Sequence, residues 1–477
     1  MRIAMAASEG APFVKTGGLG DVMQALPEAL AALPHNEVCV FLPCYKRVKE
    51  QYGDQLALVT HFEVNLGWRR QYVGLLRLRS RRRKLQIYFI DNEYYFGRDG
   101  IYGFADDGER YAYYCKAVLA SLSYLDFRPE ILQCNDWQTA LIPLLARSEF
   151  SADFVETKTV FTIHNVEYQG WTDRWFFFDA LELPEWCLER LEKDDSLNFM
   201  KAAIETADLV TTVSETYARE LLYPYYAHGM DEVLRANAGK LTGIINGIDT
   251  RVFDPQGDSA LFARYDSATY REGKAVNKAK IQELCGLPQR PEVPMLAMIT
   301  RLAGHKGIDL LCYILDRLME REVQLVILGT GEQKYEQALL AAQARYPEKL
   351  SVNLCFNTAF ASQIYAAADV YLMPSRSEPC GLSQIIAMHY GTVPVVNETG
   401  GLKDTVAAYN SETGAGRGYT FQSYNADDFL AAIDRCLHLY WHEPEKWAQL
   451  VRSDMALDVS WSVPAGQYMA LFRRLMD

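Results

Sequence analysis

Apolar runs that alternate with helical stretches occur twice along the chain, and this pattern constrains its fold most strongly. Candidate strands lie at residues 2–7, 37–42, 85–90, 130–134, 158–163 and 208–213, and again at residues 294–300, 323–328, 352–356, 370–374 and 392–396. Several of these runs are apolar throughout, as expected of strands that are buried on both faces. Strands that alternate with helices indicate βαβ units, so we expect an α/β protein with doubly wound parallel sheets.

The length of the chain predicts more than one domain. Its 477 residues exceed what one hydrophobic core usually contains, and two domains are the expectation. A short strand meets an Asn-Gly turn within residues 243–249, which favours a hinge there. We therefore predict an N-terminal domain of residues 1–245 and a C-terminal domain of residues 246–456. A last helix, within residues 457–477, is expected to pack back on the first domain.

Charge and composition argue against several classes of partner. The net charge of −13 disfavours a nucleic-acid partner, which would require a basic face. One basic run, residues 77–84, is predicted to be a solvated face of antiparallel hairpins within residues 59–90. No apolar run is long enough to span a membrane, and the N-terminus lacks the features of a signal peptide. Ten cysteines without a C-x-x-C pair indicate reduced thiols in a cytoplasmic protein.

The most informative segment is residues 375–384, Ser-Arg-Ser-Glu-Pro-Cys-Gly-Leu-Ser-Gln. It follows an apolar run and precedes a helical pattern. This order places Glu378 and the backbone N–H groups of Cys380 and Gly381 at the carboxyl end of a strand, where open α/β sheets bind ligands. A carboxylate that accepts hydrogen bonds from hydroxyls, beside N–H donors at a helix start, suits a sugar that carries a phosphate. The segment predicts a sugar-nucleotide site.

Three other loops at strand ends could contribute anion-binding groups. The Gly17-Gly18 turn opens a helix after the first strand, with Lys15 beside it, although glycines for tight packing explain it equally well. Arg301 and Lys306 share one loop and suit a pyrophosphate, the alternative being two solvated cations. The third loop, Thr399, Gly400 and Gly401, repeats the glycine turn.

Polar residues at strand ends of the first half form a candidate sugar pocket. His164 and Asn165 close one predicted strand, Asp136 follows another, and Asn246 lies near the hinge. A lone histidine is more often structural. Of the aromatic clusters, we interpret only Tyr95 as a sugar contact and assign residues 171–178 to core packing. The sequence has no D-x-D triplet for a metal-bound nucleotide, so we expect neither a metal nor a cofactor.

Taken together, these motifs closely resemble those of bacterial glycogen synthases and plant starch synthases, and they occur in the same order. The matching segments are residues 15–19, 135–138, 164–165, 246–249, 301–302, 306–307, 375–384 and 399–402. The resemblance implies a GT-B fold, in which two Rossmann-like domains flank a cleft. It also implies transfer of glucose from ADP-glucose to the non-reducing 4-hydroxyl of an α-1,4-glucan, with retention of the anomeric configuration.

The resemblance also implies roles for individual residues. The catalytic set is Glu378, Arg301, Lys306, His164 and Asp136. The donor-binding set is Lys15, Gly17, Gly18, Asn246, Cys380, Gly381, Leu382, Thr399, Gly400 and Gly401. The acceptor-binding set is Tyr95 and Asn165. Apart from Asp136, no first-domain carboxylate at a strand end suits a double displacement, so we expect front-face attack in which a phosphate oxygen takes the acceptor's proton.

Two alternatives remain at this level. The chain could be a retaining GT-B glucosyltransferase with a small sugar or sugar-phosphate acceptor. A non-catalytic glucan-binding relative would have lost charges that are present here at Lys15, Arg301, Lys306 and Glu378. Ile386 stands where related retaining enzymes often carry a ribose-binding glutamate, so the choice between ADP- and UDP-glucose stays open. Oligomeric state, effector control and preferred glucan length stay open as well.

Overall fold

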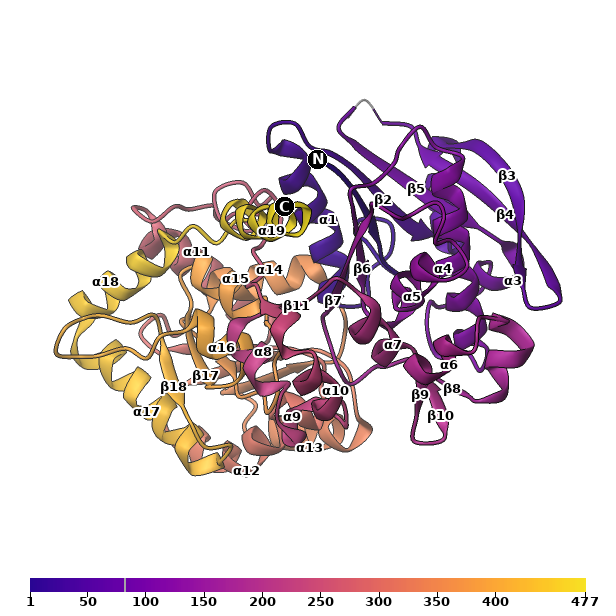
Figure 1. Ribbon diagram of the computed structural model, residues 1–477. Helices are drawn as coiled ribbons and strands as arrows, with labels where there is room; N and C mark the ends of the chain where they lie inside the picture. The colour runs from indigo at the N-terminus through magenta and orange to yellow at the C-terminus, as the bar shows by residue number, and fades with distance from the viewer. Residues whose placement is uncertain (81–82) are drawn as a thin grey trace. The chain divides into compact units, whose positions relative to one another are not determined.

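The computed structural model describes residues 1–80 and 83–477, which form two compact units (Figure 1). Unit 1 comprises Met1–Gly247 and Trp461–Asp477, and unit 2 comprises Ile248–Ser460. The chain thus passes from the first unit to the second at Gly247, close to the predicted position at residue 245. Arg81 and Arg82, in the middle of the basic run, lie outside the described residues. Within the described part of the chain, no helix is long and apolar enough to cross a membrane.

Unit 1 contains a nine-stranded sheet with the order β12-β11-β7-β6-β1-β2-β5-β4-β3. Its strands are β1 (Arg2–Ala6), β2 (Glu37–Pro43), β3 (Leu56–Leu66), β4 (Arg69–Leu78), β5 (Leu85–Asp91), β6 (Ile131–Asn135), β7 (Lys158–Ile163), β11 (Leu209–Thr212) and β12 (Leu241–Gly243). The strands from β12 to β5 pair in parallel, and β3 and β4 add an antiparallel edge. The expected hairpin region is therefore confirmed. The order reverses between β1 and β6, where doubly wound sheets bind ligands.

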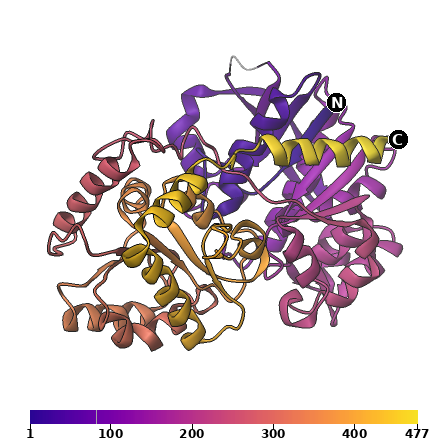
Figure 2. The ribbon, with the colours of Figure 1, turned by 90° about the vertical axis from the view of Figure 1, so that its left-hand side faces the viewer.

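Helices flank this sheet in unit 1. They are α1 (Gly18–Ala32), α2 (Lys46–Tyr52), α3 (Glu93–Phe96), α4 (Asp107–Ser123), α5 (Leu141–Arg147), α6 (Trp186–Leu191), α7 (Phe199–Thr206), α8 (Glu215–Glu220), α9 (Pro224–Ala227), α10 (Asp231–Ala236) and α19 (Ser462–Met476). Figures 1 and 2 show the C-terminal helix α19 beside α1. The Asn36 Nδ2 atom, just after α1, donates to Met469 Sδ of α19 at 3.2 Å. This contact ties the end of the chain to unit 1.

A small sheet that the sequence did not predict lies beside these helices. It consists of β8 (Trp171–Asp173), β10 (Ser196–Asn198) and β9 (Glu192–Lys193), paired antiparallel in that order. Five residues, Phe177–Leu181, form a single π-helical turn after β8. Strands of two or three residues give too short a periodic pattern to be recognised in a sequence.

Unit 2 contains a six-stranded parallel sheet with the order β15-β14-β13-β16-β17-β18. Its strands are β13 (Met295–Ile299), β14 (Gln324–Leu328), β15 (Leu350–Asn353), β16 (Val370–Met373), β17 (Val393–Asn397) and β18 (Tyr419–Phe421). Counted along the chain this is the order 3-2-1-4-5-6 of dinucleotide-binding folds. The strand predicted at residues 352–356 lies earlier in the chain. It is β15, which ends at Asn353, and the Phe356 side chain is 80 % exposed.

The helices of unit 2 cover this sheet. They are α11 (Tyr270–Leu284), α12 (Ile308–Met319), α13 (Gln333–Arg345), α14 (Thr358–Ala367), α15 (Ser383–His389), α16 (Gly400–Thr405), α17 (Ala426–His442) and α18 (Pro444–Met455). Every strand contributes buried aliphatic or aromatic side chains to one core. That core holds the strand ends in fixed positions, and the candidate loops begin at those ends.

A buried carboxyl group in α18 predicts pH-dependent stability. Asp454 is 1 % exposed, and neither of its carboxyl oxygens accepts a hydrogen bond from the described residues. Burial raises the pKa of Asp454 to about 8, against the opposing charge of Arg417. Because the folded form holds this proton more tightly than the unfolded chain, the free energy of unfolding should fall as the pH rises from about 4 to about 8.

We therefore expect Asp454→Asn to flatten this dependence. Chemical denaturation at pH 5 and at pH 8.5 should show a smaller difference between the two pH values for the variant than for the wild type. The control is Asp153→Asn, because Asp153 is exposed. Equal pH dependence in wild type and Asp454→Asn would show that this carboxyl group is not the source.

Candidate functional site

The candidate loops of unit 2 follow strands that are neighbours in the sheet. Arg301 and Lys306 come after β13, Glu378 comes after β16, and the Thr399–Gly401 turn comes after β17. Because β13, β16 and β17 are adjacent and parallel, their carboxyl ends lie at one edge of the sheet. The strand order reverses between β13 and β16, which is where such sheets bind ligands.

A charged pair joins two of these loops. The Lys306 Nζ atom donates to Glu378 Oε2 at 2.7 Å, and the Ser375 hydroxyl donates to the same oxygen at 3.0 Å. Both charged side chains are largely shielded from solvent, at 19 % exposure for Lys306 and 9 % for Glu378. The predicted phosphate-binding cation and the predicted sugar-binding carboxylate therefore occupy one place, where a single ligand could contact both.

The loops that carry this pair are packed closely together. Asn397 Nδ2 donates to the Ser375 carbonyl oxygen at 2.9 Å, which fixes the loop after β16 to the end of β17. Gly307 has a φ of +78°, and a Cβ atom there would lie 2.2 Å from the Pro374 carbonyl oxygen. Only glycine allows so close an approach. The pair is thus positioned by backbone contacts as well as by its own charges.

The glycine turn after β17 supports the Glu378 loop, which corrects part of the prediction for its N–H groups. The Gly401 N–H donates to the carbonyl oxygens of Glu378 and Pro379, each at 3.1 Å, and the Thr399 N–H donates to Asn397 O at 2.9 Å. These two donors are therefore bound within the protein rather than presented to a phosphate. Gly400 completes the turn at a φ of +46°.

The support that the glycine turn gives to the Glu378 loop can be tested by substitution. A Cβ atom at Gly401 would lie 2.1 Å from the Cys380 carbonyl oxygen, so Gly401→Ala must push two backbone segments apart. We expect its free energy of unfolding to fall by about 1–3 kcal/mol, as for other overpacked sites.

Chemical denaturation measures this change. The matched control is Gly466→Ala in α19, where an added Cβ atom meets no atom within 4 Å. That variant should be neutral or more stable by about 0.5–1 kcal/mol, since alanine is the better helix former. Equal effects of the two substitutions would contradict the role of the turn.

Other predicted donor groups of unit 2 remain available to a ligand. Arg301 is exposed, and its guanidinium group forms no ion pair within the described residues. The Gly381 N–H, at a φ of +71°, donates to no group among those same residues. Cys380 is buried beside it, and Leu382 is half-buried at the start of α15. A cation and a backbone donor thus lie in the loops that hold the Lys306–Glu378 pair.

The loop after β1 differs from its predicted role in one respect. The Glu9 carboxylate accepts from the backbone N–H groups of Thr16 (2.5 Å) and Gly17 (3.3 Å) and from the Thr16 hydroxyl. The Gly17 donor is therefore used internally, and Glu9, which the sequence did not single out, shapes the loop. Lys15 Nζ donates to Asp21 Oδ1 at 2.6 Å. Gly18 is exposed at the first position of α1.

The polar residues after β6 and β7 come together as predicted. The Asp136 Oδ1 atom accepts from the backbone N–H groups of His164 (2.7 Å) and Asn165 (3.3 Å). Asp136 also has a φ of 59°, which is rare for this residue type and is often found at functional sites. His164 Nε2 lies 3.0 Å from the side-chain oxygen of Asn135. Both strand ends therefore present fixed polar side chains at the switch point of unit 1.

Burial changes the pKa values of Asp136 and His164. It raises the pKa of Asp136 to about 7, although the two N–H donors oppose the shift, and it lowers the pKa of His164 to about 3. At neutral pH the His164 ring is therefore uncharged. An uncharged His164 can donate from Nε2 to Asn135 and leave Nδ1 as an acceptor.

Asn246 is a buried residue with an unused acceptor. It is 5 % exposed, and its side-chain oxygen accepts no hydrogen bond from the described residues. Buried polar atoms are nearly always hydrogen-bonded, so an unpaired acceptor is a feature that a ligand donor could satisfy. This observation keeps Asn246 among the candidate ligand contacts.

Tyr95 is not placed to bind an acceptor, and that prediction was wrong. Its side chain is completely buried, its hydroxyl donates to Glu109 Oε1 at 2.6 Å, and its ring packs 4.7 Å from Tyr113. The short helix α3 turns Tyr95 into the core and leaves the neighbouring Tyr94 64 % exposed. The two tyrosines are alike in sequence, and only tertiary packing distinguishes them.

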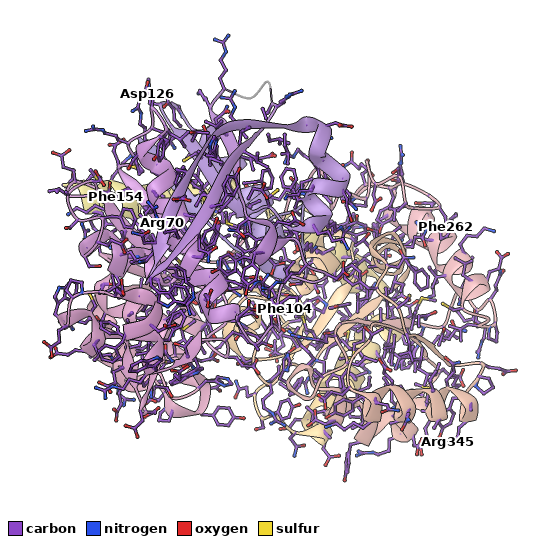
Figure 3. All side chains as sticks on the ribbon, turned by 90° about the vertical axis from the view of Figure 1, so that its right-hand side faces the viewer. Arg70, Phe104, Asp126, Phe154, Phe262 and Arg345 are labelled. Atoms are coloured by element: carbon purple, nitrogen blue, oxygen red, sulfur yellow. The ribbon has the colours of Figure 1, made fainter. Side chains whose placement is uncertain are left out.

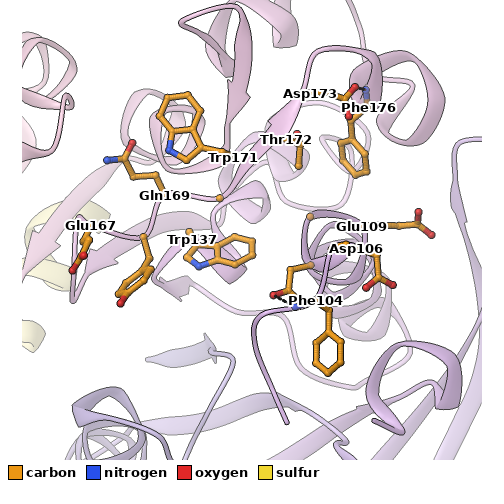
Figure 4. Close-up of a pocket in the computed structure, with 15 residues that line it drawn as sticks. Phe104, Asp106, Glu109, Trp137, Glu167, Gln169, Trp171, Thr172, Asp173 and Phe176 are labelled. Carbon is orange, nitrogen blue, oxygen red and sulfur yellow. Dashed lines mark hydrogen bonds between the residues drawn. The ribbon is translucent and has the colours of Figure 1, made fainter. Parts of the chain in front are cut away.

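An open pocket of about 660 Å³ in unit 1 was not predicted. Figure 4 shows Trp137 in its centre, with Trp171 and Phe176 above and Phe104 below; Figure 3 shows Phe104 among the side chains of the chain. The remaining lining residues are mostly acidic or polar: Ala105, Asp106, Asp107, Gly108, Glu109, Glu167, Tyr168, Gln169, Gly170, Thr172 and Asp173. Trp137 directly follows Asp136. Aromatic residues among acidic ones were the sequence signal that could have indicated this pocket.

Comparison with known proteins identifies the family. Residues 2–236 match the family described as "Starch synthase catalytic domain", and residues 286–453 match "Glycosyl transferases group 1". Glycogen synthase of Clostridium novyi (strain NT) is 44 % identical over 481 residues, which cover 100 % of this chain and 99 % of that protein. Glycogen synthase of Bacillus cereus (strain ATCC 10987 / NRS 248) is 43 % identical, with 100 % of both chains covered.

Solved structures agree with this result. The "Catalytic domain of Starch Synthase IV from Arabidopsis thaliana bound to ADP and acarbose" superposes with a TM-score of 0.90 at 30 % identity, covering 100 % of this chain and 99 % of that one. Sucrose-phosphate synthase from Thermosynechococcus elongatus shares the fold, with a TM-score of 0.61 at 17 % identity over 99 % and 98 % of the two chains. The resemblance inferred from the motifs is confirmed: the chain is a glycosyltransferase with the GT-B fold and belongs to the glycogen synthase and starch synthase family.

Proposed function

We propose that this protein transfers glucose from ADP-glucose to the 4-hydroxyl group at the non-reducing end of an α-1,4-glucan, with retention of the anomeric configuration. The observation that carries the proposal is the contact of Lys306 with Glu378 at the strand ends of unit 2. A cation for phosphate and a carboxylate for sugar hydroxyls lie side by side there, as a nucleotide sugar requires. The related starch synthase IV, whose structure contains ADP and acarbose, supports the choice of donor and acceptor.

The diphosphate and the glucose of the donor are proposed to bind at the strand ends of unit 2. Arg301 and Lys306 bind the diphosphate, Glu378 accepts hydrogen bonds from glucose hydroxyls, and the Gly381 N–H adds a donor. Lys15, Gly18 and Asn246 of unit 1 are the other residues that we propose for the donor. Lys306 is paired with Glu378, whereas Arg301 forms no ion pair within the described residues and adds an uncompensated positive charge for the diphosphate. Cations that are fixed in advance stabilise the leaving diphosphate without rearrangement during the reaction.

The acceptor is proposed to bind in the pocket around Trp137, in place of the contact first expected from Tyr95. Carboxylates accept hydrogen bonds from sugar hydroxyls, and aromatic faces pack on the apolar faces of sugar rings. The volume of about 660 Å³ is in the range that encloses ligands larger than one hexose. This size favours an oligosaccharide over a sugar phosphate, which is the alternative acceptor.

The reaction is proposed to proceed on the front face of the sugar. Retaining glycosidases use two carboxyl groups, one of them as a nucleophile. Here Asp136 is the one candidate nucleophile that we identify, and its Oδ1 atom is already bound by two backbone N–H groups. We propose instead that an oxygen of the leaving phosphate takes the acceptor's proton. Isolation of a glucosyl–Asp136 adduct from a slow substrate would contradict this step.

No metal or cofactor is proposed to take part, since the cations that bind the diphosphate are side chains. Activity should therefore survive dialysis against EDTA, and its loss with recovery on adding Mg²⁺ would contradict the proposal. The ten cysteines are thiols rather than disulfides, which supports a reducing compartment and hence the cytoplasm.

Radiolabelled transfer tests the whole proposal. The protein is incubated with labelled ADP-glucose and either glycogen, maltoheptaose, glucose 6-phosphate or fructose 6-phosphate. Label should enter glycogen and maltoheptaose, and amylase that cuts α-1,4 bonds should release it. Competition with unlabelled UDP-glucose tests which nucleotide base of the donor the protein prefers. Transfer to a sugar phosphate alone would favour the alternative, and absence of transfer to every acceptor would contradict the proposal.

A further inference from the structure

Trp68, Trp175 and Phe178 are among the large aromatic side chains that unit 1 exposes. Trp68 is 74 % exposed, Trp175 is 71 % exposed and Phe178 is 51 % exposed. The rings of Trp175 and Phe178 lie 6.0 Å apart with an angle of 44° between them. The interpretation of residues 171–178 as core packing is therefore wrong for Trp175 and Phe178. Contiguous exposed apolar surface, unlike a single exposed ring, often marks a site of interaction.

Contacts around Asp179 hold Trp68 against the segment that carries Phe178. Trp68 Nε1 donates to Asp179 Oδ1 at 3.3 Å, and Arg69 donates to Asp179 Oδ2 at 2.7 Å. Gly67, at a φ of +59°, turns the chain so tightly that a Cβ atom would lie 2.0 Å from the Asp179 carbonyl oxygen. The turn between β3 and β4 is thus held against the segment that carries Phe178. A surface ordered in advance loses little conformational entropy when it binds a ligand.

The same contacts place this surface next to the acceptor pocket. Arg69 Nε lies 4.0 Å from Glu109 Oε1, and Glu109 lines the pocket. Trp175 stands between Asp173 and Phe176 in the chain, and both of these line the pocket too. In Figure 4, Asp173, Phe176 and Glu109 lie together on the side away from Glu167. Trp68 and Trp175 are therefore joined to that wall of the pocket through their neighbours in the chain, and Phe178 lies beside Trp175.

We propose that Trp68, Trp175 and Phe178 form an outer glucan platform, which binds glucose units of the acceptor chain beyond those in the pocket. The proposal rests on the proposed function. The Arg69 guanidinium group lies 4.7 Å from the centre of the Trp68 ring, and the Trp68 side chain remains largely exposed. The angle between the Trp175 and Phe178 rings gives a curved surface, which suits an α-1,4-linked chain because such chains curve.

The platform should distinguish long acceptors from short ones. A chain that fills the pocket and reaches the platform makes two linked sets of contacts, and the second set forms at high effective concentration. A trisaccharide that only fills the pocket gains nothing from the outer rings. Glycogen and long maltodextrins should therefore bind more tightly than maltotriose, and this difference should depend on the three aromatic residues.

Substitution of the exposed rings tests the platform. The variants are Trp175→Ala, Trp68→Ala, the double variant and Phe178→Ser. The control is Tyr313→Ala, because Tyr313 is 73 % exposed on α12 of unit 2. Retardation in native gels that contain glycogen gives the dissociation constant, and initial rates give KM for glycogen and for maltotriose. Each single variant should weaken glycogen binding about threefold to tenfold, which is the usual range for a stacked aromatic contact.

The outcomes separate this proposal from the proposed function. We expect the KM for maltotriose and the kcat to stay at the wild-type values in all variants, with unchanged melting temperatures, and the Tyr313→Ala control to bind glycogen normally. Wild-type glycogen retardation in the double variant and in Phe178→Ser would overturn the platform while leaving the proposed function intact. Equal losses for maltotriose and glycogen would also overturn it. A wild-type protein that transfers no glucose and is not retarded by glycogen would overturn both.

Discussion

Replacing Lys306 with alanine should lower kcat/KM for the sugar nucleotide by about 10²- to 10³-fold, the usual effect of removing one fixed electrostatic group from an active site. Lys306 Nζ is 2.7 Å from Glu378 Oε2 and only 19 % exposed, so its position is set before the donor arrives. The loss of charge raises the energy of the departing diphosphate. The glucan does not depend on this charge, so retardation by glycogen should not change.

Two further variants separate the charge from its structural role. Lys306→Ala leaves the shielded Glu378 carboxylate without its cation, and such uncompensated charges destabilise proteins. The double variant with Glu378→Gln removes that charge as well. It should recover the melting temperature without recovering the rate.

The matched control for the rate is Lys334→Ala. Lys334 is paired with Glu332 in the same unit but is 65 % exposed. Arg301→Ala should resemble Lys306→Ala in rate while leaving stability unchanged, because Arg301 is exposed and forms no ion pair within the described residues. A normal kcat/KM in both active-site variants, or an equal loss of glycogen binding, would remove the two cations from the donor site.

The parts of this fold that could be predicted are those whose sequences are apolar over a whole strand. Buried parallel strands such as β13 and β14 are apolar throughout, and every strand end of this kind marks a possible ligand loop. Arg301, Glu378 and the Thr399–Gly401 turn could be grouped for this reason, although they are far apart in the sequence. The strand order that makes their loops adjacent was known only once the sheet was described.

The partners of polar groups could not be predicted, because they depend on contacts between distant segments. The sequence suggested free N–H groups at Gly17 and Gly401, but Glu9 binds the first and the carbonyl oxygens of Glu378 and Pro379 bind the second. Glycine was required at Gly401 for close packing rather than for an anion. The motif was therefore recognised correctly while the role of its atoms was not.

The burial of single aromatic residues could not be predicted from the sequence either. Tyr95 was expected at the surface and is fully buried, whereas Trp175 was expected in the core and is 71 % exposed. Neither position belongs to a periodic element that could have indicated its face: α3 has four residues, and Trp175 precedes a single π-helical turn. Short irregular segments carry little pattern, and here they contain part of the proposed acceptor site.

Replacing Glu378 with glutamine should reduce turnover by about 10²-fold, which is at the lower end for the loss of one active-site electrostatic contact. Glutamine keeps the size of the side chain, but it offers Lys306 a neutral amide oxygen in place of a carboxylate and therefore binds it more weakly. The carboxylate also accepts from the Ser375 hydroxyl at 3.0 Å. Both the position of Lys306 and the acceptor offered to the glucose hydroxyls should change, so kcat and donor affinity should both fall.

The control for this substitution is Ser375→Ala, which removes one neutral hydrogen bond and leaves the ion pair. Ser375→Ala should raise the activation free energy by about 0.5–1.5 kcal/mol, which lowers the rate roughly threefold to tenfold. A double-mutant cycle of Glu378→Gln with Lys306→Ala then measures their coupling. Because the two side chains act as one unit in contact, the combined loss should be much smaller than the product of the single losses. Fully multiplicative losses would mean that Lys306 and Glu378 serve the donor independently, and unchanged kinetics for Glu378→Gln would reduce this carboxylate to a structural anchor for Lys306.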